Sequence, residues 1–207
     1  MMLSMAQLVF LFIFNGSGFV FEYKIEIASV PGQPGSIDYY SIWVGEHQLR
    51  RDINNDVSTI IDLEKNIRWE LNHLNEVYYV SNVDTEPENI TFRPSWPSTE
   101  RVDSLPCDVF ETKVEQPDGN ILIKIWISKK AIMTNGKNLL ELLTNQSLEQ
   151  AFGGRVPRGV PVKFSVAVSQ NNSNEVIELM KIKLTSQKEL DIPPSKFELP
   201  LGYILKE

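Results

Sequence analysis

The feature that most constrains this chain is a two-residue alternation of apolar and polar side chains. Residues 21–28 and 162–169 both show it, as expected for strands that bury one face. In residues 121–128 every second residue is isoleucine and the other face is partly apolar, so we expect both faces of that strand to be covered. The same reasoning, with turn residues as separators, predicts further strands at 38–44, 49–52, 59–63, 67–71, 77–80 and 109–114. The chain is therefore predicted to be mainly β.

One strand changes the phase of its alternation. The apolar positions Ile177 and Leu179 are followed by Met180, Ile182 and Leu184, which is a shift of one residue. Such a shift predicts a β-bulge.

One segment has the pattern of a helix instead. Asn138 can cap the N-terminus, Glu141 completes a capping box, and Gly153-Gly154 can end the helix. We expect a helix over about 139–152, substantially covered by sheet. Four prolines between Asp84 and Pro106 predict a long loop there. A linker between two domains is the alternative for that stretch, but a single domain over 19–207 is preferred because neither half alone has enough apolar strands for a core.

Composition excludes several classes of function. A net charge of −7 and a pI near 5.0 argue against nucleic-acid binding. The single cysteine, Cys107, rules out an intramolecular disulfide and is interpreted as a small buried side chain. His47 and His73 lie beside turn residues and are expected to be solvent-exposed, and Asp52–Asp56 lacks the glycine and terminal glutamate of a calcium loop. No catalytic motif is present, so we expect no enzyme, no cofactor and no metal site.

The N-terminus predicts export. No charged residue precedes Glu22, and residues 8–14 form an apolar run that is too short to cross a bilayer. Gly16 and Gly18 fit the spacing of a signal-peptidase site, which predicts a signal peptide at 1–18 and a periplasmic or secreted protein that starts at Phe19. An uncleaved membrane anchor and a buried first strand are the alternatives. Membrane association is expected only through an uncleaved N-terminus.

Aromatic residues suggest a candidate binding site. Several tryptophans fall on strand positions that nominally face outward, so another part of the chain or a ligand is expected to pack against them. A core shared with the helix is one interpretation, and an apolar cleft between a curved sheet and the helix is the other. For the cleft, the candidate ligand-binding residues are Trp43, Trp69, Trp126, Leu140 and Leu143.

The order of short motifs resembles a known family. The motifs are Trp43-Val44, Leu49-Arg50-Arg51-Asp52, Ile60-Ile61-Asp62-Leu63-Glu64-Lys65, Trp69-Glu70-Leu71, Tyr79, Cys107, Ile125-Trp126-Ile127-Ser128 and Pro200-Leu201-Gly202-Tyr203. Together they look like an exported bacterial domain of unknown function, the family numbered 4412, which is similar in pattern to the lipoprotein carriers LolA and LolB.

The resemblance implies an α+β fold in which a curved antiparallel sheet forms an unclosed half-barrel, with the 139–152 helix over its concave face. It also implies a ligand, a lipid or lipoprotein acyl chain held in the cavity. The alternative is an envelope structural or interaction protein with a solid core and no ligand. Its oligomeric state is not predicted.

The C-terminus is expected to dock on the body of the protein. Residues 197–205 are mostly apolar, and Pro194 and Pro200 prevent a continuous strand. We expect at most an edge pairing, a bend at Gly202, and burial of Phe197, Leu199, Ile204 and, at least in part, Tyr203.

Overall fold

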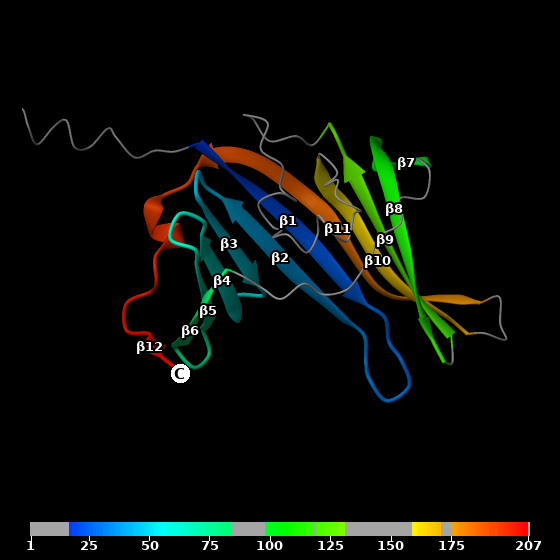
Figure 1. Cartoon of the computed structure of the whole chain (residues 1–207), viewed down its shortest axis with the longest axis horizontal. Helices are drawn as coiled ribbons and strands as arrows, with labels where there is room; N and C mark the ends of the chain where they lie inside the picture. The colour runs from blue at the N-terminus through cyan, green and yellow to red at the C-terminus, as the bar shows by residue number, and fades with distance from the viewer. Residues whose placement is uncertain (1–16, 84–97, 118, 131–158, 171–174, 207) are drawn as a thin grey trace, which may run out of the picture. The chain divides into compact units, whose positions relative to one another are not determined.

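The structure, a computed structural model, describes residues 17–83, 98–117, 119–130, 159–170 and 175–206 (Figure 1). Its strands occur in one sheet with the order β12-β6-β5-β4-β3-β2-β1-β11-β10-β9-β8-β7. Their bounds are β1 Ser17–Ile27, β2 Ser36–Val44, β3 Gln48–Ile53, β4 Val57–Asp62, β5 Ile67–Asn72, β6 Val77–Asn82, β7 Thr99–Val102, β8 Leu105–Gln116, β9 Gly119–Ser128, β10 Val160–Gln170, β11 Val176–Asp191 and β12 Ile204–Leu205.

The chain divides into two compact units. Unit 1 comprises Met1–Phe21, Ser41–Val83 and Gln187–Glu207, and unit 2 comprises Glu22–Tyr40 and Asp84–Ser186. Strands β1, β2 and β11 each contribute residues to both units.

The strand predictions are confirmed, and so is the bulge. All ten predicted segments lie in strands to within one residue, although β11 is much longer than expected. In the β10–β11 pair, Val166 faces Met180 and the next residue, Ala167, faces Glu178, so Leu179 is the extra residue. The bulge restores the phase of the strand and keeps Ile177 and Met180 on one face.

The predicted α+β class with a covering helix is wrong. Within the described ranges the chain is almost entirely strand, and the only helix there is the 3-10 turn η2, Pro194–Phe197. The sheet is open, with β12 and β7 at its two ends, so the predicted half-barrel with a helix over it is replaced by a nearly all-β sheet. The segment 139–152 itself lies outside the described residues. Capping signals show only where a helix can begin, because most helical stability in proteins comes from tertiary packing.

The predicted loop over 84–106 needs a correction as well. Residues 84–97 lie outside the described ranges, but β7 and the start of β8 form a hairpin across 99–106. Asp103 and Ser104 make its turn with φ of 46° and 72°. Pro106 is tolerated in β8 because it lies before Asp108, where the pairing of β8 with β9 begins, so β8 is paired only with β7 at that point.

Unit 1 contains an antiparallel meander, β3 to β6, with the C-terminal segment against it. Its core is Val20, Ile60, Leu71, Ile192 and Phe197. The docked C-terminus is confirmed: Phe197 is buried, Leu199 and Tyr203 pack on the core, Gly202 bends at a φ of 91°, and β12 pairs with β6. The expected burial of Ile204 is wrong, since its exposed fraction is 64%.

Unit 2 contains antiparallel strands β8 to β11 and the hairpin that joins β1 to β2. The backbone N–H of Ala28, at the base of the hairpin, donates to Leu179 of β11 at 2.8 Å. Cys107, near the start of β8, is buried as predicted.

Candidate functional site

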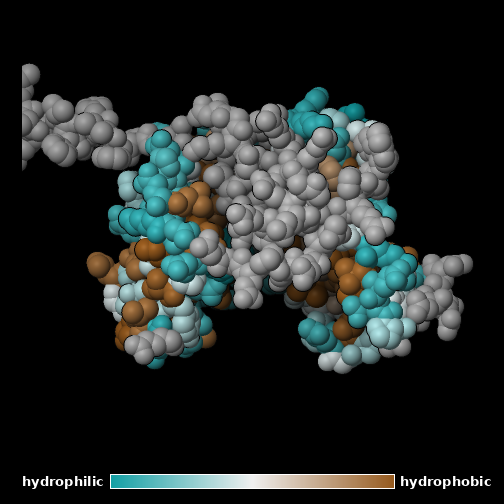
Figure 2. Space-filling model, viewed as in Figure 1, coloured by the Kyte–Doolittle hydropathy of each residue, from teal (hydrophilic) through white to brown (hydrophobic). Residues whose placement is uncertain are grey.

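Strands β8 to β11 of unit 2 have one continuous apolar face. Pairing aligns three rows across the four strands: Phe110, Ile125, Phe164 and Ile182; Thr112, Ile123, Val166 and Met180; Val114, Ile121, Val168 and Ile177. All of these side chains except Thr112 are apolar, and we call this surface the apolar face. It extends about 14 Å across the strands and about 14 Å along them, from the usual spacings in sheets. Hydrophobic residues, in brown, are visible over these strands in Figure 2.

The opposite side of the same strands is charged. Its rows are Val109, Trp126, Lys163 and Lys183, and Glu111, Lys124, Ser165 and Lys181. The Trp126 indole N–H donates to Glu100 Oε2 at 2.6 Å, and Lys163 Nζ lies 4.1 Å from the centre of its ring. Trp126 is buried on this polar face, so it does not line the apolar face.

Of the other predicted binding residues, the structure describes two, and both belong to a different unit from Trp126. Trp43 and Trp69 belong to unit 1, where they pack partly buried against its core. Leu140 and Leu143 lie outside the described residues. Residue type alone favours the tryptophans, whereas the described apolar face is made mainly of isoleucine, valine and phenylalanine.

Unit 2 also has a groove of about 350 Å³ with charged walls. Glu26 pairs with Lys24 at 2.6 Å and with Lys181 at 3.3 Å, and Asp103 pairs with Lys183 at 2.7 Å. These pairs neutralise most of the charge that the groove presents. It is not the apolar cleft that the sequence predicts.

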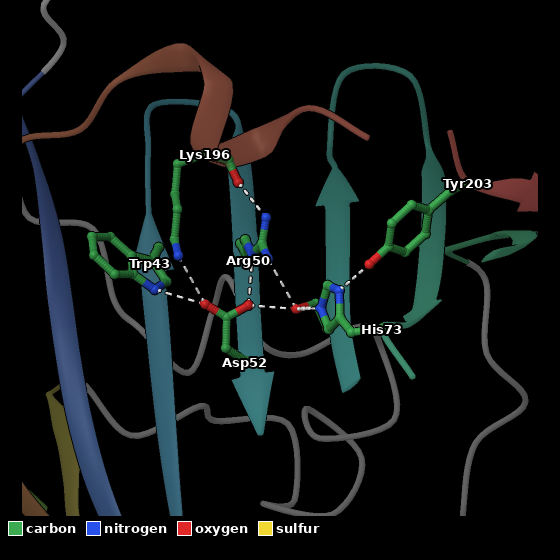
Figure 3. Close-up of polar contacts among 7 residues, drawn as sticks. Trp43, Arg50, Asp52, His73, Lys196 and Tyr203 are labelled. Atoms are coloured by element: carbon green, nitrogen blue, oxygen red, sulfur yellow. Dashed lines mark hydrogen bonds and ion pairs between the residues drawn. The ribbon is translucent and has the colours of Figure 1, made fainter. Parts of the chain in front are cut away.

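Unit 1 holds a network of polar side chains centred on the carboxylate of Asp52 (Figure 3). Oδ1 accepts from Arg50 Nε and from Ser58 Oγ, both at 2.6 Å. Oδ2 accepts from Trp43 Nε1 at 3.1 Å and from Lys196 Nζ at 3.0 Å. Burial disfavours the charged carboxylate, but the hydrogen bonds from Ser58, Arg50 and Lys196 outweigh that effect and lower the pKa of Asp52. Asp52 is therefore an ionised acceptor.

Ser58 and His73 form the second half of this network. His73 Nε2 lies 2.6 Å from Ser58 Oγ, and His73 Nδ1 lies 2.6 Å from the Tyr203 hydroxyl. Burial, followed by the nearby charge of Arg50, lowers the pKa of His73, so the ring is neutral near pH 7. The prediction of an exposed His73 is wrong, whereas His47 is exposed as predicted.

The directions of these hydrogen bonds argue against a nucleophilic serine. An ionised Asp52 only accepts, so the single proton of Ser58 is donated to it. Nε2 of His73 must then donate to Ser58, and Nδ1 accepts from Tyr203. A general base would need the reverse arrangement, with the serine proton directed at the histidine. Ser58 is also only 1% exposed. The network therefore fastens the C-terminal segment to the meander, since Lys196 and Tyr203 both come from that segment.

In the ranges that the structure describes, no three histidine, cysteine, aspartate or glutamate side chains form a cluster suited to a metal ion. No helix in those ranges is long and apolar enough to span a bilayer.

Comparison with known proteins gives the fold only. No protein-family model matches the chain, and no curated protein matches it. Among solved structures it is similar to an uncharacterized conserved protein from Thermus thermophilus, with a TM-score of 0.54 and 9% identity over 93% of this chain and 90% of that one. It is also similar to PNGF-II, with a TM-score of 0.50 and 14% identity over 92% of this chain and 31% of that one. These two likenesses support the arrangement of strands and carry no function to this chain.

Proposed function

We propose that this protein is an exported binding protein that holds a lipid or lipoprotein acyl chain against the apolar face of strands β8 to β11. The observation that supports this most directly is the set of three aligned apolar rows, which contain no charged residue, whereas the two rows described for the opposite side contain five. The resemblance to family 4412 and to the carriers LolA and LolB points to the same ligand class.

The size of the apolar face suits such a ligand. Each methylene removed from water contributes about 0.8 kcal/mol, so about ten buried methylenes contribute roughly 8 kcal/mol before ordering costs. Ordering costs reduce that sum, so the expected affinity is micromolar at best. Binding at about this level, with little dependence on salt, is the expected result.

A matched pair of variants tests the location. Ile123 and Leu122 are neighbours in β9, both half-buried, and their side chains lie on opposite faces of the sheet. Palmitic acid binding would be measured by displacement of a hydrophobic fluorescent dye. Ile123→Asn should weaken binding about tenfold or more, whereas Leu122→Asn should leave it nearly unchanged. Equal losses in both variants, or no saturable binding by the wild type, would contradict the proposal.

The second candidate is an envelope structural or interaction protein without a ligand. It is favoured by Thr112 and Ile125, which are only 6% and 7% exposed although they lie on the apolar face. If the whole face is core, the dye and the fatty acid will both fail to bind.

Export is part of the proposal. It is supported by the uncharged leader and its signal-peptidase spacing. Mass spectrometry of protein from its native source should show a chain that begins at Phe19. An intact Met1 on a cytoplasmic species would contradict export, and an intact leader in the membrane fraction would favour an anchor.

A further inference from the structure

The hairpin between β1 and β2 has no charged side chain from Ile27 to Ile37. In a chain with 23% charged residues, eleven consecutive positions would ordinarily include two or three charges. In Figure 1 this hairpin, drawn in blue, projects as a narrow loop from the β1–β2 pair.

The tip of the hairpin is well ordered by its own contacts. Val30 and Gln33 exchange two backbone hydrogen bonds of 3.0 and 2.9 Å around Pro31-Gly32, and Gly32 has a φ of 85°. At Gly35 a Cβ atom would lie 2.7 Å from the Ile27 carbonyl oxygen, so the two arms approach more closely than a larger residue allows. A surface already held in this way loses little conformational entropy on binding.

Apolar side chains are exposed on both arms. The exposed fraction is 38% for Ile27, 57% for Ile37 and 63% for Tyr39. Every residue from Pro31 to Ile37 is exposed, so the tip meets solvent on all sides. A protein partner covers one side of such a tip, whereas a bilayer interface surrounds it.

We propose that the uncharged part of the β1–β2 hairpin, residues 27–37, inserts into the interfacial layer of an electrically neutral lipid bilayer. Charge favours a neutral membrane, because a protein of net charge −7 with an uncharged tip gains nothing from anionic lipid. The position of Tyr39 nearer the body suits the headgroup level, where tyrosine is enriched. The outer backbone groups of a hairpin need water or headgroups as partners, so the tip does not enter the hydrocarbon core. This inference rests on the proposed function and adds to it the place where an acyl ligand is exchanged with the membrane. It does not depend on an N-terminal anchor.

Vesicle flotation of the full chain tests it, with phosphatidylcholine vesicles at low and high salt. The wild type should float with the vesicles at both salt concentrations. Ile37→Asp should lower the partition coefficient about tenfold, since a carboxylate must then be carried into the interface. The matched control is Leu74→Asp, which changes an 86% exposed leucine in the β5–β6 turn of unit 1 and should float like the wild type. Urea denaturation confirms that both variants fold.

The results separate this inference from the proposed function. Palmitic acid binding in vesicle-free solution should be the same for Ile37→Asp and the wild type. If the wild type binds vesicles but no fatty acid, the proposed function fails and the membrane hairpin stands. No flotation, flotation only with phosphatidylserine vesicles, or equal losses in Ile37→Asp and Leu74→Asp would overturn the inference.

Discussion

Replacing Asp52 by asparagine tests whether the polar network stabilises unit 1. The substitution keeps the shape of the side chain but removes its charge and turns one oxygen into a donor. In either orientation the new amide NH2 faces two donors, the pair Arg50 and Ser58 or the pair Trp43 and Lys196. Two of the four hydrogen bonds are then lost, and the remaining two are made to a neutral acceptor.

The size of the stability loss depends on how deeply the donors that lose their acceptor are buried. Hydrogen bonds to charged groups contribute about 1.5–3 kcal/mol each, and breaking a buried ion pair costs about 3–5 kcal/mol. The side chains of Asp52 and Arg50 are 12% and 13% exposed, so solvent replaces little of what is lost. We expect Asp52→Asn to lower the free energy of unfolding by about 3 kcal/mol.

Urea denaturation followed by tryptophan fluorescence measures this change. With typical urea m-values the midpoint should fall by about 1–3 M. The control is Asp103→Asn, which breaks the ion pair with Lys183; because the Asp103 side chain is 62% exposed, it should cost under about 1 kcal/mol. Asp52→Asn that loses no more than this control would refute the reasoning and show that the network forms without stabilising the unit.

Three other results are expected. Deleting residues 197–207 should lower the melting temperature by several degrees. Burial of Phe197 alone contributes about 3 kcal/mol, and each kcal/mol shifts the melting temperature of a domain of this size by about 2–4 °C. An unchanged melting temperature would mean that the segment is a free tail. The pKa of His73 is lowered in the folded state, so protonation favours the unfolded state, and the free energy of unfolding should fall as the pH drops below about 6.5. His73→Gln should reduce this dependence of stability on pH. An identical pH profile in the variant would contradict the assignment. Burial, the largest effect, raises the pKa of Cys107, so the native thiol should resist maleimide and become reactive in urea; rapid labelling of the native protein would show that the residue is accessible.

The strands were predictable because alternation records which side of a sheet is buried. This applies even to the bulge at Leu179, where the sequence shows the change of phase and the pairing of Val166 and Ala167 shows its cause. The β7–β8 hairpin was not predictable from the same reasoning. Its turn uses Asp103 and Ser104 at positive φ rather than glycine, and Pro106 is tolerated because β8 does not yet pair with β9 at that position.

The polar network shows why the candidate site could be predicted only in part. Asp52 and Arg50 are two residues apart on β3, a spacing that places both on one face, and Ser58 faces Asp52 across the β3–β4 hairpin. These three are therefore recoverable from alternation and a short turn. His73 and Tyr203 are 130 residues apart in the sequence, and Lys196 and Asp52 are 144 residues apart. No local sequence pattern predicts either contact. Local spacing predicts the part of a site that one hairpin builds. The C-terminal segment then determines whether His73 is a solvated turn residue or a neutral member of a partly buried network.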